Sequence, residues 1–186
     1  MAKTPSSMVP LGTFAPMFEL PDVQTGKILR LADMLGEYAT VICFMCNHCP
    51  YVKHIEDVLA SVSRTYEAPG VSWIAINSND VERYPDDSPL HMKELCREKG
   101  YTFPYLFDET QEVARAFGAA CTPDFFVYDK NRTLAYRGQF DDSRPGNNIP
   151  VTGSSLTDAL DALLAGNAVS TAQKPSLGCN IKWKDA

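Results

Sequence analysis

The segment Val41-Ile-Cys-Phe-Met-Cys-Asn-His-Cys-Pro50 joins a continuous apolar run to the start of a helical pattern. The apolar part, 41–45, predicts a strand that is buried on both faces. Two cysteines, Cys46 and Cys49, follow at the junction between this strand and the helix. A pair with this spacing can interconvert between two thiols and a disulfide, and a helix start stabilises a thiolate. The segment therefore predicts redox chemistry at the end of a buried strand.

Length and composition are typical of one soluble globular domain. The chain has 186 residues, of which 45% are hydrophobic and 22% charged, and its net charge is -6 at pH 7. This charge argues against a nucleic-acid partner, because such binders present a basic face. Apolar stretches fall short of the roughly 20 residues of a membrane span, and the polar start does not resemble a signal peptide. We therefore expect a cytoplasmic protein without a membrane or nucleic-acid partner.

Strand and helix patterns alternate along the chain and predict an α/β fold. Helical spacing of apolar residues covers 50–66, 89–99, 110–117 and 156–164. Strand patterns cover 14–20, 27–30, 41–45, 71–76, 103–107, 124–129 and 133–140. We expect the first central strands to be parallel and the late hairpin antiparallel. Ser155 and Asp158 predict a capping box for the last helix, and the polar segment 77–89 predicts a surface loop.

The order of these features resembles the redoxin branch of the thioredoxin-like superfamily, which includes peroxiredoxins and thiol–disulfide reductases. Three segments carry the resemblance, namely Gly12-Thr-Phe-Ala-Pro-Met-Phe-Glu-Leu20, Cys46-Asn-His-Cys49 and Cys121-Thr-Pro-Asp-Phe-Phe126. It implies a thioredoxin-like three-layer α/β/α sandwich with a mixed central sheet and an N-terminal extension. We expect this domain to span 12–166 and the tail, 167–186, to pack on it.

Cys46 is the predicted attacking thiol, because the first cysteine of the pair is expected at the exposed helix start. Cys49, expected one turn into the helix and more buried, would resolve the mixed disulfide. Asn47 and His48 lie between them and are predicted to tune the pair. A protonated His48 would stabilise the thiolate, although an isolated loop histidine is only partly protonated at neutral pH. The segment 39–42 carries no carboxylate, so a buried acid beside the pair is not evident.

Thr122 and Pro123 are the predicted substrate-docking residues. The resemblance implies that their peptide bond is cis, and the backbone of Thr122 could then pair with an extended substrate strand. Cys121, directly before them, is either an auxiliary redox thiol or a small core residue. Cys179, in the tail, is either a resolving thiol or a structural residue. The carboxylates of 80–87 are interpreted as parts of a solvated loop.

The leading interpretation is a thiol–disulfide oxidoreductase. Its substrate would be a disulfide in a protein or a small molecule, and an unidentified thiol system would reduce it. One alternative is an antioxidant thiol peroxidase of the peroxiredoxin kind. The sequence disfavours it, because the positions three before Cys46 and Cys49 hold cysteine instead of threonine or serine.

A non-catalytic redox sensor or a metal-binding module is the third interpretation. Cys43-x-x-Cys46-x-x-Cys49-Pro50 matches the start of an iron–sulfur motif. However, Cys43 lies inside the predicted strand, and a zinc site made of Cys46, His48 and Cys49 lacks a second half. The glycines are scattered and form no phosphate-binding loop, and flavin and haem signatures are absent. We expect neither a metal nor a cofactor.

Overall fold

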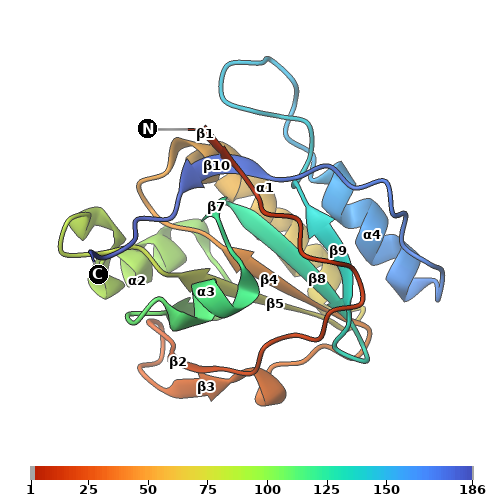
Figure 1. Ribbon diagram of the computed structural model, residues 1–186, viewed down its shortest axis with the longest axis horizontal. Coiled ribbons are helices and arrows are strands. Elements are labelled where there is room, and N and C mark those ends of the chain that lie inside the picture. Colours follow the sequence, from red (N-terminus) through yellow and green to blue (C-terminus); the bar gives the residue numbers. More distant parts are fainter. Residues whose placement is uncertain (1–2, 186) are drawn as a thin grey trace.

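A five-stranded mixed sheet forms the centre of the computed structural model, which describes residues 3–185 (Figure 1). Its strands, in spatial order, are β6 (Tyr105–Phe107), β5 (Val71–Asn77), β4 (Ala39–Phe44), β8 (Asp124–Asp129) and β9 (Leu134–Gly138). β4, β5 and β6 are parallel, whereas β8 is antiparallel to both β4 and β9. The parallel first strands and the antiparallel hairpin confirm the predicted topology.

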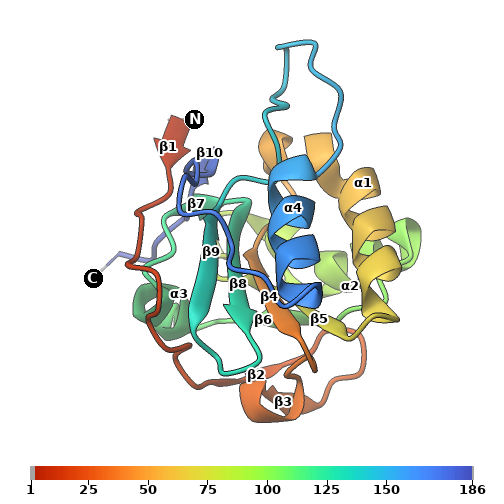
Figure 2. The same cartoon turned by 90° about the vertical axis from the view of Figure 1, so that its right-hand side faces the viewer.

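Helices cover both faces of this sheet and complete the predicted three-layer sandwich. They are α1 (Pro50–Glu67), α2 (Pro89–Lys99), α3 (Glu112–Phe117) and α4 (Ser154–Leu164). Alternate residues of β4 point to opposite faces, as in any strand. Val41 and Cys43 join the core under α1, α2 and α4, whereas Ile42 and Phe44 join the core under α3. Figure 2 shows α1 and α4 on one side of the sheet and α3 on the other.

Two smaller sheets lie outside the central one. β2 (Glu19–Pro21) and β3 (Ile28–Arg30) form a hairpin, and the short helix η1 (Leu31–Asp33) follows it. The predicted strand over 14–20 is too long, because within 14–18 only Phe14 bridges to another segment. The second sheet has the order β1 (Lys3–Pro5), β10 (Leu177–Asn180) and β7 (Cys121–Thr122). β10 was not predicted, since its four residues show no alternation.

The prediction that 77–89 is a solvated loop is wrong for its buried residues, although Glu82, Arg83 and Asp86 are exposed. Asn77, Asn79 and Asp87 are at most 2% exposed. They bond to one another, since the Asn77 amide donates to the backbone carbonyl of Asp87 and the Asn79 amide donates to the Asp87 carboxylate. The tail lies against them, with the Lys182 N–H donating to Asn79. This segment, which includes the short helix η2 (Pro85–Asp87), therefore contains a buried polar network around Asp87.

The predicted capping box of the last helix is also wrong. α4 begins directly after Gly153, whose φ of 73° is left-handed and favours glycine. A Cβ at Gly153 would approach the Phe140 ring to 2.8 Å, so the position has no room for a side chain. The Asp141 carboxylate accepts the N–H groups of Thr152 and Gly153 at 2.6 and 2.7 Å. A distant carboxylate therefore organises this helix start in place of Ser155.

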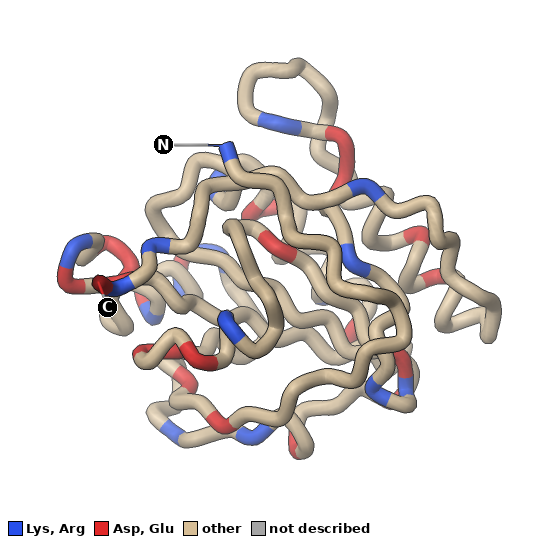
Figure 3. The backbone as a smooth tube through the Cα atoms, in the orientation of Figure 1, with Lys and Arg blue, Asp and Glu red and all other residues tan. Residues whose placement is uncertain are grey.

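Surface charge and the tail complete the description. Lys and Arg alternate with Asp and Glu along the chain, and neither sign forms a long run (Figure 3). Within residues 3–185 no helix combines the length and apolarity that crossing a membrane requires.

Ile181 is 1% exposed and Trp183 packs against the same core as α3. These two tail residues therefore pack on the domain.

A buried ion pair fixes the loop that carries Thr122. The Arg137 guanidinium forms a bidentate pair with Asp124, and both side chains are fully buried. Burial raises the pKa of the Asp124 carboxyl, and the charge of Arg137 opposes that rise. Asp124 also accepts the Ala120 N–H, and Arg137 donates to the Ser7 carbonyl. The pair therefore joins β8, β9, the N-terminal segment and the loop before Pro123.

Arg137→Met should lower the free energy of unfolding by about 3–5 kcal/mol, because it leaves the buried Asp124 charge unpaired. Chemical denaturation at pH 7 measures the effect. The control is Arg97→Met on the exposed face of α2, which should change stability by less than about 0.5 kcal/mol. Equal, small effects of the two substitutions would show that the buried pair contributes nothing.

Candidate active site

The cysteine pair lies where β4 ends and α1 begins. The Met45 N–H still donates to the Ile76 carbonyl, so Cys46 is the second residue beyond β4. α1 starts at Pro50, whose ring fixes a helical φ, and Cys49 is therefore the N-cap residue. The sequence analysis placed Cys46 at the helix start and Cys49 one turn in, which is wrong. The dipole of α1 favours a thiolate at Cys49.

Both sulfurs are buried in the dithiol form. Cys46 is 1% exposed and Cys49 is 0% exposed, so the predicted exposed attacking thiol is wrong for this state. Thr122 contacts both residues. Its hydroxyl lies 3.3 Å from Cys46 Sγ, and its carbonyl oxygen lies 3.1 Å from Cys49 Sγ. The pair is therefore held against one residue of β7 and closed to solvent.

The charge of the dithiol pair rests on Cys49. Burial raises the pKa of Cys46 well above its ordinary value. The hydrogen bond from Cys46 lowers the pKa of Cys49; burial opposes this, and bonds from Cys179 and the Thr122 hydroxyl add to the lowering. The Thr122 carbonyl can accept a hydrogen bond only from a protonated Cys49 thiol, so it opposes ionisation of Cys49. Cys46, Cys179 and the Thr122 hydroxyl, together with the N-terminus of α1, favour the thiolate and outweigh this single acceptor. The arrangement stabilises a Cys49 thiolate that is hydrogen-bonded to a Cys46 thiol.

Asp87 is the residue of the site that the sequence analysis missed. Its carboxylate accepts the N–H groups of Asn47 and His48 at 2.8 and 3.0 Å. It also pairs with His48 Nδ1 at 2.6 Å and accepts from the Asn79 amide at 2.8 Å. Burial raises the pKa of Asp87, but the bonds from His48 and Asn79 and the His48 charge lower it further, below its ordinary value. Asp87 is thus an ionised buried acid that fixes the turn between the two cysteines.

The two residues between the cysteines have defined positions. His48 Nδ1 lies 3.9 Å from Cys46 Sγ, and its ring stacks on Tyr84 with centroids 5.1 Å apart. The Tyr105 hydroxyl donates to the Asn47 side chain at 3.3 Å. His48 therefore touches the sulfur of Cys46, whereas Asn47 turns toward Tyr105. That these residues tune the pair stays a prediction.

Cys46, His48 and Asp87 offer a sulfur, a nitrogen and an oxygen within 4.8 Å of one another. Such a donor set suits zinc or a similar divalent ion. The same His48 nitrogen already pairs with Asp87, so binding a metal would replace that contact. Cys43, the first cysteine of the apparent iron–sulfur motif, donates to the neighbouring Phe44 carbonyl instead. These three residues are where a metal would be held.

Thr122 and Pro123, the predicted docking residues, have the expected peptide-bond geometry, but the strand edge beside them is not free to bind a substrate. The Thr122–Pro123 peptide bond is cis. Thr122 is 3% exposed and pairs in register with Cys179 of β10, so the chain's own tail occupies the edge predicted for substrate. Cys121 is 0% exposed, its thiol donates to the Pro123 carbonyl, and burial raises its pKa. This environment favours the core alternative for Cys121.

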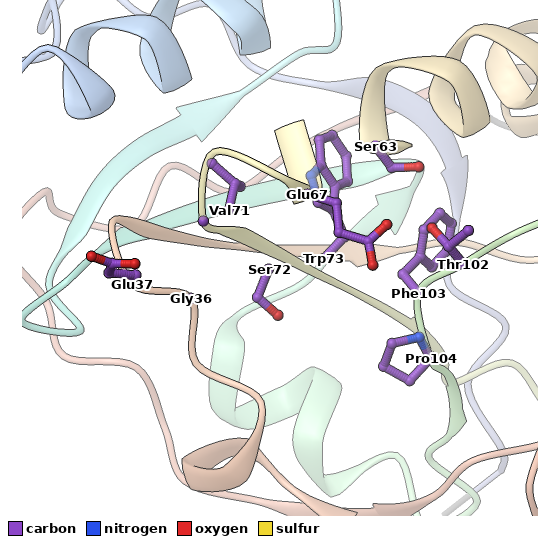
Figure 4. A pocket seen from close by; sticks show the side chains of 11 residues that line it. Gly36, Glu37, Ser63, Glu67, Val71, Ser72, Trp73, Thr102, Phe103 and Pro104 are labelled. Atoms are coloured by element: carbon purple, nitrogen blue, oxygen red, sulfur yellow. The ribbon is translucent and has the colours of Figure 1, made fainter. Parts of the chain in front are cut away.

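Two hollows lie at different distances from the cysteine pair, one far from it and one beside it. A cavity of about 260 Å³ lies beside the first residues of β5 and is lined in part by Gly36, Glu67 and Trp73 (Figure 4). Because Cys46 follows the last residues of the neighbouring parallel strand β4, this cavity is at the other end of the sheet. A second hollow of about 420 Å³ is lined in part by Asn47 and His48. The second one borders the redox pair.

Comparisons with known proteins identify the family of this chain. The model of the AhpC/TSA family matches residues 11–137. The chain belongs to the AhpC/TSA family. The thiol-disulfide oxidoreductase ResA of Geobacillus thermodenitrificans is 27% identical over 128 residues, which are 69% of this chain and 68% of that protein.

Solved structures show what fold the chain shares. An uncharacterised conserved protein of Geobacillus kaustophilus is 56% identical, with a TM-score of 0.99 over 100% of this chain and 98% of that one. A proposed thiol:disulfide interchange protein, DsbE, of Chlorobium tepidum is 21% identical, with a TM-score of 0.66 over 84% of this chain and 99% of that one. The second likeness shows the fold alone. The AhpC/TSA chain therefore has the thioredoxin-like fold that its sequence predicts.

Cys49 should titrate near pH 5 in the reduced protein, and Cys46 well above the ordinary thiol value, because the pair shares one proton. The 13Cβ shifts of labelled cysteines, followed against pH by NMR, report each residue. Cys46→Ala assigns the signals and should raise the pKa of Cys49 by removing a thiol donor. A Cys49 pKa at or above the ordinary value in the unmodified protein would contradict this charge distribution.

Asp87→Asn should lower the free energy of unfolding by about 1–3 kcal/mol at pH 7, because a buried acceptor of four bonds loses its charge. Folding lowers the pKa of Asp87, so its contribution is present above the unfolded value of about 3.9 and disappears as pH falls through the folded value. Denaturation from pH 7 down to about pH 3 should show the two proteins converging.

Asp86→Asn is the matched control for this series, since Asp86 is the adjacent residue and is exposed. It should leave stability within about 0.5 kcal/mol at each pH. A stability difference between Asp87→Asn and the natural protein that stays constant down to the lowest pH would exclude the carboxylate as its cause.

Proposed function

We propose that this protein is a thiol–disulfide oxidoreductase whose redox couple is Cys46 and Cys49. The observation that carries the proposal is the contact of Thr122 with both sulfurs, at 3.3 and 3.1 Å. One residue thus holds two thiols together, with a thiolate favoured on one of them. The ResA relative is named as a thiol-disulfide oxidoreductase, which supports the same chemistry here.

Cys46 is the sulfur that a substrate reaches first. Its neighbour His48 is half-buried and lines the hollow of about 420 Å³, so movement of one side chain opens a path to Cys46. The Cys49 sulfur lies among buried residues, since Cys46, Thr122 and Cys179 are each at most 3% exposed. Access therefore favours attack by Cys46 and resolution by Cys49, the order that the sequence analysis predicts.

The electrostatics of the pair supply the nucleophile. As Cys46 Sγ attacks a substrate disulfide, its proton passes along the hydrogen bond to the Cys49 thiolate. The substrate disulfide breaks, one substrate thiolate leaves, and Cys46 carries the mixed disulfide. That leaving thiolate takes the proton from Cys49, which then attacks Cys46 and releases the second substrate sulfur as a thiolate. The protein ends as the Cys46–Cys49 disulfide, and the substrate has gained two electrons and one proton.

Substrate and setting follow from the same site. A disulfide in a protein or in a small molecule suits the hollow beside His48, and a thiol reductant would return the pair to the dithiol state. The cytoplasmic location stays a prediction. In the peroxidase alternative, peroxide would replace the substrate disulfide and convert Cys46 to a sulfenic acid. Stopped-flow consumption of hydrogen peroxide by the reduced protein distinguishes the two reactions.

Cys49→Ser should accumulate mixed disulfides with a substrate disulfide, because the attacking sulfur remains and the resolving sulfur is gone; they should form slowly, since the thiolate that takes the Cys46 proton is gone as well. Cys46→Ser should accumulate at least about tenfold fewer, because the remaining Cys49 is enclosed. Intact-mass spectrometry after incubation with oxidised glutathione measures both. Cys96→Ser, which removes a thiol from α2, is the matched control and should leave the reaction unchanged.

Equal trapping by Cys46→Ser and Cys49→Ser would contradict the assigned order of attack. Absence of mixed disulfides in both variants, together with an unreactive natural protein, would contradict the oxidoreductase itself. Fast peroxide consumption by the reduced protein, without any reaction with disulfides, would replace the proposal by the peroxidase alternative.

A further inference from the structure

The C-terminal strand lies directly over the redox pair. β10 is antiparallel to β7, with Cys179 opposite Thr122 and Asn180 opposite Cys121 (Figure 1). Its other edge pairs with β1, so it is held from both sides. Thr122 is the residue that touches both sulfurs of the pair. The tail therefore places a third cysteine against the residue that organises the first two.

Gly178 shows how closely this strand fits. A Cβ at this position would lie 2.0 Å from the Thr122 carbonyl oxygen and 2.6 Å from its carbonyl carbon. Real Cβ atoms do not approach backbone so closely, so only glycine allows β10 to lie at this depth. The contact is with rigid backbone and not with a flexible side chain. The position of the next residue, Cys179, is thus fixed relative to Thr122.

The Cys179 thiol is the third member of a sulfur cluster. It is 2% exposed and lies in the same buried cluster as Cys46 and Cys49, and both Cys46 and Cys179 act as neighbouring donors that lower the pKa of Cys49. Cys49 therefore lies between two cysteines. Cys43 and Cys121 have separate partners, since their thiols donate to the carbonyls of Phe44 and Pro123. Neither the proposed cycle nor the core explains why a thiol in the tail faces the resolving cysteine.

We propose that Cys179 is a third redox residue, which exchanges with the Cys46–Cys49 disulfide by attacking Cys49. The proposal rests on the function proposed above and extends it. A bond forms between the sulfurs of Cys179 and Cys49, and the bond between Cys49 and Cys46 breaks. The electron pair goes to Cys46, which takes up the proton that Cys179 loses. The number of disulfides is unchanged, so the exchange needs no further oxidant.

The exchange changes which of the three cysteines carries the free thiol. It returns Cys46, the sulfur beside His48 and the hollow, to the thiol state while the protein keeps its oxidising equivalents. It also ties β10 covalently to the start of α1, so the edge of β7 stays covered in this state. Reduction of the Cys49–Cys179 bond would restore the free thiols of this structure, in which β10 stays paired with β7. The tail thus acts as a built-in partner for the redox pair.

Disulfide mapping tests the proposal on the full chain. Cys46→Ser protein is oxidised with one equivalent of diamide, alkylated, digested and analysed by mass spectrometry without reduction. We expect Cys49–Cys179 as the main disulfide, and in the natural protein both Cys46–Cys49 and Cys49–Cys179. In Cys179→Ser we expect Cys46–Cys49 alone. Cys46→Ser/Cys121→Ser is the control, and it should form Cys49–Cys179 as readily as Cys46→Ser does.

The outcomes separate this inference from the proposed function. Free Cys49 and Cys179 in Cys46→Ser, under conditions that join Cys46 to Cys49 in the natural protein, would overturn the role of Cys179 alone. A natural protein that forms neither disulfide would overturn the oxidoreductase and this inference together.

Gly178→Ala separates the placement of the strand from the presence of its thiol. It moves β10 away from Thr122 while all cysteines remain. In the Cys46→Ser background it should slow formation of Cys49–Cys179 at least about tenfold, because a disulfide tolerates little change in geometry. Circular dichroism and thermal unfolding check that the variant folds. An unchanged rate in a folded variant would mean that β10 does not position Cys179, and the inference would fall.

Discussion

The contact of Thr122 with the two cysteines is the constraint on which the site depends. Its hydroxyl meets Cys46, its carbonyl meets Cys49, and its backbone pairs with Cys179. Thr122 in turn is held in place by the start of β8, since Asp124 is locked to Arg137 inside the core. A small displacement of Thr122 would change both hydrogen bonds of the pair. The redox site is therefore as rigid as the sheet that carries it.

Burial and charge act in opposite directions in this site. Enclosing the thiols raises the pKa of Cys46, and a deeply buried thiolate would be costly without donors. The cost is offset where donors converge, at Cys49, which also stands before the first turn of α1. Asp87 adds a negative charge on the Cys46 side and raises the pKa of that thiol further. The closed dithiol state thus holds its charge on the inner sulfur and presents a neutral thiol toward His48.

Local patterns predicted most of the fold but not the enclosure of the site. α1 and α2 follow from apolar residues at helical spacing and begin at prolines, which mark helix starts in sequence. β10 could not be predicted, because four residues with a central glycine carry no alternation and pair only through the tertiary structure. The exposure expected for Cys46 failed for the same reason, since the tail covers the pair.

The role of Asp87 shows a second limit of local patterns. It lies in an acidic, proline-containing segment that has the composition of a loop. Its burial depends on Asn79 and His48, which approach it only in the folded chain. Segment 39–42 carries no carboxylate. In the sequence, this was the one signal that a buried acid beside the cysteine pair would have to come from another segment. By contrast, Cys46, Cys49 and Thr122 were recognisable because spacing and order along the chain define them.

A redox titration of the Cys46/Cys49 couple tests the central claim most directly. The protein is equilibrated in buffers of reduced and oxidised dithiothreitol or glutathione, the free thiols are blocked with acid quenching, and the products are weighed by mass spectrometry. The account predicts a reversible two-electron transition at a potential between about −270 and −120 mV, lost in Cys49→Ser. Thiols that stay reduced in every buffer would contradict it.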